Sequence, residues 1–203
     1  MSSPGSGAGA GESPVYRPIR QMTVFWRGKR LTVRSLRATP ADARQLSALT
    51  RQVAQEGWLG MSDPLGDAEH TLRFIQASLA NGSVLLGMFD GRVLVGHLGL
   101  DRWPDPPPFR RAGLVLYLGP AYRGGGLGRA LLQIGLEAAR RLRITRVQAA
   151  SHPANAAATA LYKEAGFRLQ ASAGVIGDSR TDGADPANPF PEETLYWILD
   201  FAK

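Results

Sequence analysis

The sequence predicts an α+β protein of three layers, in which helices cover both faces of a mixed, mostly antiparallel central sheet of about seven strands. Three observations predict this fold class. The chain has 203 residues, of which 44% are hydrophobic, so it suits one domain with a sizeable core. Its first half contains short apolar runs joined by tight turns. In its second half an apolar run, a glycine-rich turn and an amphipathic helix follow one another.

The first half is expected to hold four strands and two helices. The strands are predicted at residues 22–26, 31–36, 83–89 and 92–100. An Arg-Gly-Lys-Arg turn joins the first pair, and Asp90-Gly91 joins the second pair as a two-residue hairpin. Thr39-Pro40 is typical of a helix start and predicts a helix to about residue 55. A second helix is predicted over residues 67–80, where apolar residues share one stripe.

The second half is expected to alternate strands and helices. Its strands are predicted at residues 114–118, at 147–151, from Phe167 onward and at 194–201. Between the first two, the apolar residues of 127–142 recur at steps of three or four, which is the pattern of a helix packed on a sheet. Asn155 can cap another helix in an alanine-rich segment, and Gly166 suits its left-handed end.

A glycine-dense turn, Tyr122-Arg-Gly-Gly-Gly-Leu-Gly-Arg129, lies between the buried strand and the amphipathic helix. Such a turn lets several backbone N–H groups point at one place, and with the positive end of the helix dipole they favour phosphate or another anion. Arg123 and Arg129 add positive charge beside it. The turn lacks the lysine of a P-loop, and its glycines do not fit Gly-x-Gly-x-x-Gly. What it does contain is Arg123-x-x-Gly126-x-Gly128.

A second motif follows in the segment Asn155-Ala-Ala-Ala-Thr-Ala-Leu-Tyr162-Lys-Glu-Ala-Gly166-Phe167. The Arg-x-x-Gly-x-Gly turn resembles the acyl-CoA pyrophosphate loop of the GNAT superfamily of N-acetyltransferases, and the second segment resembles that superfamily's Asn…Ala…Leu-Tyr…Gly-Phe helix. The two motifs occur in the order that the superfamily has. The order of elements matches over residues 31–203, and the likeness is strongest over residues 114–167.

This resemblance implies an activity and a set of site residues. It implies that an acetyl group moves from acetyl-CoA, as co-substrate, to a primary amine of a small molecule or peptide by direct attack. The backbone of Leu116, Tyr117 and Leu118 would pair with the pantetheine arm. Asn155 and Ala158 would contact the cofactor from the neighbouring strand end. The pyrophosphate would bind at the turn, formed by Arg123, Gly124, Gly125, Gly126, Leu127, Gly128 and Arg129.

Acyl transfer to an amine also needs a neutral nucleophile and an acid for the departing sulfur. The resemblance places Tyr162 near the thioester sulfur, where it can bind the cofactor and protonate the thiolate. Many relatives carry a glutamate or histidine base in or just before the central strand, but residues 110–117 here contain neither. His152 is the favoured base among three candidates, the others being His97 and Asp101, and water alone stays open.

The missing base keeps a second class of function open, a GNAT-fold module that binds acyl-CoA as a sensor or structural partner without turnover. The amine is open too: an antibiotic, a polyamine, an amino acid or a protein terminus. Residues 57–66 and 171–193 are expected to border it. The second segment carries Asp178, Asp182, Asp185, Glu192 and Glu193, so it is either an acidic lip for a cationic amine or a solvated loop. Homodimers are common in the family, and a homodimer is a further open expectation.

Composition limits the remaining possibilities. The net charge of +7 is spread over dispersed basic residues, so no nucleic-acid partner is expected. No apolar run is long enough to cross a membrane, and the Gly/Ser-rich start lacks the features of a secretory signal. We therefore expect a disordered tail at residues 1–18, a single domain at residues 19–203 and a cytoplasmic location. With no cysteine and three scattered histidines, no metal site is expected.

Overall fold

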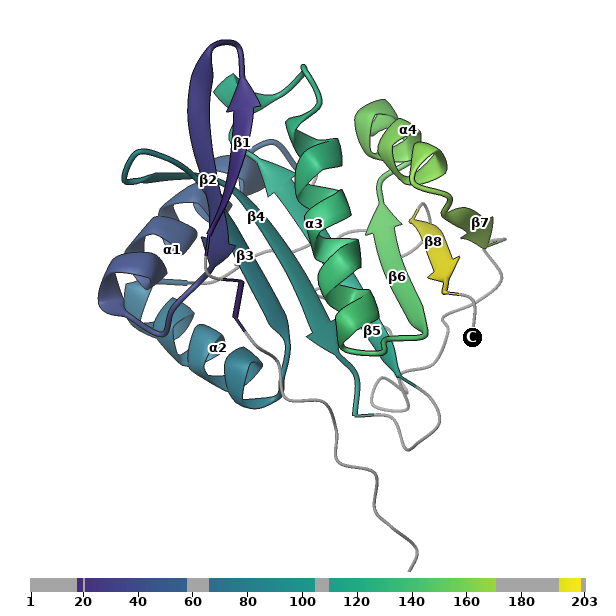
Figure 1. The fold of residues 1–203 in the computed structure, drawn as a ribbon, viewed down its shortest axis with the longest axis horizontal. Coiled ribbons are helices and arrows are strands. Elements are labelled where there is room, and N and C mark those ends of the chain that lie inside the picture. Colours follow the sequence, from purple (N-terminus) through teal and green to yellow (C-terminus); the bar gives the residue numbers. More distant parts are fainter. Residues whose placement is uncertain (1–17, 20, 58–65, 105–109, 171–193, 202–203) are drawn as a thin grey trace, which may run out of the picture.

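The computed structural model describes residues 18–19, 21–57, 66–104, 110–170 and 194–201. Figure 1 shows the arrangement of their helices and strands. The strands are β1 (Met22–Trp26), β2 (Lys29–Ser35), β3 (Val84–Asp90), β4 (Val93–Arg102), β5 (Arg111–Leu118), β6 (Arg146–Ser151), β7 (Arg168–Gln170) and β8 (Leu195–Asp200). The α-helices are α1 (Pro40–Ala54), α2 (Ala68–Ala80), α3 (Leu127–Arg141) and α4 (Ala156–Glu164), and a short 3-10 helix, η1, spans Pro120–Tyr122.

The eight strands form one sheet in the order β1-β2-β3-β4-β5-β6-β8-β7. Its paired strands are antiparallel except β5 and β6, which run parallel. The predicted α+β fold with a mixed, mostly antiparallel sheet is therefore confirmed. The sheet has eight strands where about seven were expected, and the strand predicted from Phe167 onward is the short edge strand β7, which pairs with β8.

Helices cover both faces of this sheet, which gives the three layers seen in Figure 1. One hydrophobic cluster joins α1 and α2 to the sheet, with Leu46 and Ile75 among its fully buried members. The other joins α3 and α4 to the opposite face, with Leu131 and Tyr162 among its members. Side chains of β5 alternate between the clusters, since Leu114 faces the second cluster and neighbouring Val115 the first.

Polar side chains cap three of the four α-helices of the described residues. Thr39 Oγ1 accepts from the Asp42 N–H at 3.3 Å, and Pro40 is the first residue of α1, as the sequence predicts. Asp67 accepts from two N–H groups of α2 at 2.8 and 3.0 Å. Asn155 Oδ1 caps α4 by accepting from the Ala158 N–H at 3.0 Å. These local signals explain why the predicted helix starts are confirmed to within one residue.

The two predicted hairpins are confirmed, but both turns differ from the predicted ones. In the second hairpin Asp90 pairs with Val93, so the turn consists of Gly91 and Arg92 and not of Asp90 and Gly91. In the first hairpin Trp26 pairs with Lys29, so the turn consists of Arg27 and Gly28 alone, and β2 begins at Lys29 instead of Leu31. Both turn residues have positive φ, 47° at Arg27 and 74° at Gly28. This conformation matches the twist of two strands joined by a two-residue turn.

Strands β5 and β6 part before either of them ends. β5 pairs with β4 as far as Leu118, but its pairing with β6 ends at Leu114, opposite Ala149. β6 continues to Ser151 along β8. The sheet therefore splits at this end, and the glycine turn follows one branch of the split while α4 follows the other.

Some expectations fall on residues beyond the described ranges. Of the expected tail, only Pro18 is described, and of the two expected acceptor segments the structure describes Gly57 and Gly66. The acidic residues of 171–193 lie outside the described residues. No helix in the described ranges is both long and apolar enough to cross a membrane.

Candidate functional site

The glycine turn forms the N-terminus of α3. Gly124, Gly125 and Gly126 have φ values of 71°, 71° and 87°, a left-handed conformation that side-chain-bearing residues rarely adopt. Gly126 is the N-cap residue and supplies no side chain, so α3 lacks the polar cap that α1, α2 and α4 have. The first N–H groups of α3 have no partner within the helix, and with the helix dipole they favour an anion.

The two arginines of the turn are engaged in ion pairs. Arg123 binds both carboxylate oxygens of Glu56 at 2.6 and 3.0 Å, and it also donates to the Leu118 carbonyl at 3.0 and 3.1 Å. Arg129 pairs with Glu164 of α4. Arg123 therefore ties the end of β5 to the end of α1 as well as lying beside the turn. Sequence reasoning missed Glu56, since no local pattern links it to a residue 67 positions away.

The first hairpin also contacts the turn. The Trp26 indole Nε1–H donates to the Gly124 carbonyl at 3.1 Å, although the two residues are 98 positions apart. A Cβ at Gly125 would lie 2.6 Å from the same indole nitrogen, so only glycine fits there. Trp26 is a second contact that sequence reasoning missed.

The main chain of β5 presents Leu116 and Leu118 to the split in the sheet. Gly119 donates its N–H to the Val95 carbonyl at 2.9 Å. Hydrogen-bonded pairs alternate along an antiparallel ladder, so Tyr117 and Val115 also direct their main-chain groups to β4. Leu116 and Leu118 direct theirs the other way, beyond the last pair with β6.

Tyr117 has its side chain on the opposite face of the sheet from α3. Its hydroxyl lies 2.6 Å from Thr50 Oγ1, which itself donates to the Leu46 carbonyl, so Tyr117 is the donor in this buried chain of hydrogen bonds. Burial raises the pKa of Tyr117 well above its ordinary value. Of the three predicted strand residues, the structure thus brings Leu116 and Leu118 to the split through their main chains and directs Tyr117 elsewhere.

Gly128 marks the place where β5, α3 and α4 meet. A Cβ at this position would lie 3.7 Å from the Leu161 side chain, 3.9 Å from that of Leu118 and 4.0 Å from that of Leu116. The predicted residues Leu127 and Gly128 on α3 therefore lie beside the helix that Asn155 and Ala158 begin. The two predicted motifs, the glycine turn and the Asn155 helix, thus lie on either side of the split.

Between α3 and α4 lies a hollow of about 340 Å³. Its lining is partly apolar, from Leu132, Leu136 and Leu161, and partly charged, from Arg129 and Glu164. It begins in the first turn of α3, next to the glycines.

Tyr162 projects from α4 into the hydrophobic cluster under that helix. It is 4% exposed, and its ring lies 5.3 Å from that of Phe167 and 6.0 Å from that of Trp197. Burial raises the pKa of Tyr162 to about 12. Its hydroxyl has no hydrogen-bond partner among the described residues. A phenol in this setting holds its proton throughout the neutral range and can donate it to a ligand atom.

The three candidate bases lie in different surroundings. His152 follows β6 directly, and its Nδ1 accepts from the Ala154 N–H at 3.1 Å, so its neutral form carries the proton on Nε2. His97 is buried on the α1 and α2 side, 5.3 Å from the Tyr117 ring. Asp101 pairs with Gly113, about 17 Å along β5 from Leu118 at the rise of a β-strand. Burial raises the pKa of Asp101. Only His152 is adjacent to α4.

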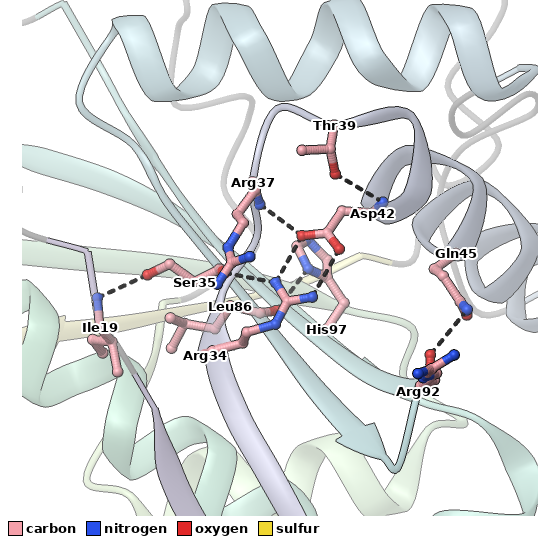
Figure 2. Close-up of polar contacts among 10 residues, drawn as sticks. All are labelled: Ile19, Arg34, Ser35, Arg37, Thr39, Asp42, Gln45, Leu86, Arg92 and His97. Carbon is pink, nitrogen blue, oxygen red and sulfur yellow. Dashed lines mark hydrogen bonds and ion pairs between the residues drawn. The ribbon is translucent and has the colours of Figure 1, made fainter.

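His97 predicts a pH dependence of stability. Its Nδ1 contacts the Leu86 carbonyl at 2.9 Å, as Figure 2 shows, and burial lowers the pKa of His97 to about 4. Below pH 6.5 His97 therefore binds a proton in the unfolded chain but not in the folded protein, and this favours unfolding. Between pH 7.5 and pH 5 we expect the free energy of unfolding of the parent protein to fall by about 2 kcal/mol more than that of His97→Gln.

Chemical denaturation at the two pH values measures this difference. His70→Gln is the matched control, because His70 is exposed on α2, and it should keep the parent's pH dependence. Equal pH dependence in the His97 and His70 variants would contradict the assignment.

Within the described ranges, no group of three or more His, Asp or Glu side chains lies close enough to hold a metal ion.

Two comparisons with known proteins bear on the site. Residues 50–167 match the family model described as the acetyltransferase (GNAT) family. The chain is also 37% identical over 83 residues to the N-alpha-acetyltransferase RimI of Mycobacterium tuberculosis, an alignment that covers 41% of this chain and 51% of RimI. The chain thus spans about half the length of this curated relative.

Solved structures show the same fold at lower identity. The protein yncA of Salmonella typhimurium, solved with its cofactor acetyl-CoA, is 22% identical with a TM-score of 0.66, covering 84% of this chain and 93% of its own. The GNAT domain of S. lividans PAT is 21% identical with a TM-score of 0.68, covering 89% and 97%. The ribosomal-protein-alanine N-acetyltransferase of Brucella melitensis is 24% identical with a TM-score of 0.66, covering 83% and 99%.

Proposed function

Because this chain belongs to the GNAT acetyltransferase family, we propose that it transfers an acetyl group from acetyl-CoA to a primary amine by direct attack of the amine nitrogen. One observation carries the proposal. The parting of β5 and β6 after Leu114 lies between a helix start that lacks a side-chain cap and a second helix that carries Tyr162, a buried phenol without a hydrogen-bond partner among the described residues. This arrangement offers main-chain groups, an anion site and a proton donor around the split in the sheet.

In this proposal the main chain holds most of acetyl-CoA. The backbone groups of Leu116 and the N–H of Leu118 pair with the amide-containing pantetheine arm, as a further strand would, while the Leu118 carbonyl accepts from Arg123. The pyrophosphate binds at the start of α3, against the N–H groups that follow Gly124. Asn155 and Ala158 border the same arm from the start of α4.

The proposed chemistry needs no covalent enzyme intermediate. The amine nitrogen bonds to the thioester carbon while a backbone N–H of β5 stabilises the developing charge on the oxygen. The carbon–sulfur bond then breaks, and Tyr162 gives its proton to the departing thiolate. The acetylated nitrogen loses its extra proton, and the Tyr162 phenolate recovers one from water. The products are an N-acetyl amine and the free thiol of CoA.

His152 is proposed as the base that receives the amine proton, with water in the path. Its imidazole follows β6, next to the residues that begin α4. The contact between its Nδ1 and the Ala154 N–H occupies one ring nitrogen, so proton uptake at that atom requires this contact to break.

The relatives favour one acceptor among several. RimI is named an N-alpha-acetyltransferase, and the Brucella protein is named a ribosomal-protein-alanine N-acetyltransferase. A protein α-amine is therefore the first acceptor to test for this chain.

The test is thiol release from acetyl-CoA with a panel of amines. The panel should contain peptides with N-terminal alanine, polyamines, free amino acids and aminoglycosides. Steady release with one class supports the enzyme and names the acceptor class. Tight acetyl-CoA binding without turnover across the panel would instead support a sensor, and an absence of binding would exclude both.

Gly126 provides a direct test of the anion site. A Cβ at Gly126 would meet no protein atom within 4 Å, so a side chain there would project into the space proposed for the pyrophosphate. We expect Gly126→Val to abolish the rise in melting temperature that acetyl-CoA gives the parent protein through mass action.

Gly91→Val is the matched control for backbone strain. Gly91 also has positive φ, at 58°, and open space around it, but it lies in the β3–β4 hairpin. Gly91→Val should lower the melting temperature of the unliganded protein and keep the rise in melting temperature that acetyl-CoA gives. An unchanged shift in a folded Gly126→Val protein would contradict the site.

A further inference from the structure

We propose that the β1–β2 hairpin completes the phosphate site: Arg27 binds a phosphate group of the acyl-CoA nucleotide, and Trp26 is a positioning residue for the glycine turn. This inference rests on the proposed acyl-CoA site and adds residues to it that lie outside both sequence motifs. It concerns a part of the chain that precedes the residues matched by the family model.

Trp26 fixes one peptide of the turn. Its indole N–H holds the Gly124 carbonyl, and Trp26 is itself 8% exposed, so the contact is sheltered from water. Because a trans peptide is planar, the N–H of Gly125 must point away from the indole. The indole therefore determines which way the main chain of the turn directs its donors.

The hairpin is joined to the turn by a second set of contacts. The Trp26 ring lies 5.6 Å from the Tyr122 ring, on the 3-10 helix that leads into the turn. The Tyr122 hydroxyl donates to Asp90 Oδ2 at 2.8 Å, and Lys29 pairs with the same oxygen at 2.8 Å. The hairpin thus contacts both the 3-10 helix that precedes the turn and the turn itself.

Arg27 is the cation that this attachment brings to the anion site. Its guanidinium lies over the Trp26 ring, 4.7 Å from the ring centroid. Its Nη2 lies 3.9 Å from the position that a Cβ on Gly124 would occupy. Arg27 holds this place in a left-handed conformation, at φ 47°, which a residue with a side chain adopts at some cost.

No acid among the described residues balances the charge of Arg27, whereas the cations near it are paired. Arg123 pairs with Glu56, Arg129 with Glu164 and Lys29 with Asp90. Among the described residues Arg27 has no carboxylate within ion-pair distance. A guanidinium beside uncapped N–H groups matches a phosphate, because it can donate two parallel hydrogen bonds to the phosphate oxygens.

The experiment measures CoA binding by calorimetry at low and high salt. Arg27→Gln removes the charge and should weaken CoA binding about tenfold at low salt, and less at high salt, where exposed charges are screened. Arg30→Gln is the matched control, since Arg30 is exposed on the same hairpin and has no hydrogen bond or ion pair with the turn in the described part of the chain; it should stay within about twofold of the parent.

Trp26→Phe tests the positioning role, because it keeps a ring and removes the N–H. It should weaken CoA binding without changing the salt dependence. The unliganded protein should stay folded, with a melting temperature lowered by the lost packing of a buried ring. A folded Trp26→Phe protein with parental affinity would overturn the role of Trp26.

Two ligands locate the phosphate. If the Arg27→Gln effect disappears with dephospho-CoA, Arg27 binds the 3′-phosphate; if it persists there, Arg27 binds the pyrophosphate. Acetyl-pantetheine, which has no phosphate, must bind both proteins equally. The role of Arg27 is overturned if Arg27→Gln matches Arg30→Gln in CoA affinity, or if acetyl-pantetheine binding falls equally. A parent protein that binds no CoA would instead refute the proposed function.

Discussion

Replacing Tyr162 with phenylalanine is expected to lower kcat about 100-fold and to leave the affinity for acetyl-CoA nearly unchanged. The variant keeps the ring that packs on Phe167 and Trp197 and removes only the hydroxyl. Because burial raises the pKa of Tyr162 to about 12, the phenol is protonated wherever the protein is assayed and can act as an acid. An interaction made only in the transition state changes kcat more than binding.

Two measurements are needed for this variant. Pre-steady-state turnover ensures that chemistry limits the rate, and calorimetry gives acetyl-CoA affinity separately. The melting temperature should stay close to the parent's, since the hydroxyl has no partner among the described residues to lose. A kcat within about threefold of the parent would show that Tyr162 only packs α4 against the sheet and that water protonates the thiolate.

Replacing Arg34 with methionine is expected to destabilise the fold by about 3 kcal/mol at pH 7. Arg34 binds both oxygens of Asp42 at 2.7 and 2.8 Å, as Figure 2 shows, and the Asp42 side chain is 8% exposed. The Arg37 N–H donates to the same carboxylate at 2.8 Å. Without the guanidinium, a nearly buried carboxylate at the start of α1 loses its counter-charge, and desolvation of that charge is no longer offset.

The pH dependence gives this prediction a second readout. Burial alone would raise the pKa of Asp42, but the bonds from Arg34 and Arg37 outweigh burial and hold its pKa below the ordinary carboxyl value. In the parent, this stabilisation is therefore present above pH 4 and is lost as the pH falls through the lowered pKa. In Arg34→Met the effect of burial is larger than that of the remaining bonds, and the pKa of Asp42 rises. The difference in stability between this variant and the parent should therefore shrink as the pH falls toward 4.

Matched variants separate charge from packing at this pair. Arg34 also lies over the Phe89 ring at 4.1 Å, so part of its effect comes from packing. The double variant Arg34→Met with Asp42→Asn removes the unpaired charge and should recover part of the loss. Arg30→Met, at an exposed position of the same strand, should change stability by less than about 0.5 kcal/mol. A loss below about 1 kcal/mol for Arg34→Met would place the pair with weak surface ion pairs.

Local signals in the sequence determined the elements of this fold. Thr39-Pro40, Asp67 and Asn155 begin three helices, because a capping side chain satisfies N–H groups only two or three residues away. Asp90-Gly91 predicted the second hairpin for a similar local reason, although its turn lies one residue later, at Gly91 and Arg92. The start of β5 at Arg111, three residues earlier than the predicted 114, was missed because those residues join the sheet through pairing with β4 and β6, which no local pattern reports.

The sequence by itself also determined which residues follow the two branches of the split sheet, since the glycine turn and the Asn155 helix are each contiguous in the chain. Only the tertiary structure decided how those residues are used. The pairing of Arg123 with Glu56, the turning of the Tyr117 side chain toward Thr50 and the hold of Trp26 on Gly124 join residues 67, 67 and 98 positions apart. Such contacts depend on strand register and on how the layers pack, and a shift of one residue in register would reverse every side chain of β5. Local propensity carries no information on that choice, because it arises only when distant segments bury their apolar faces together.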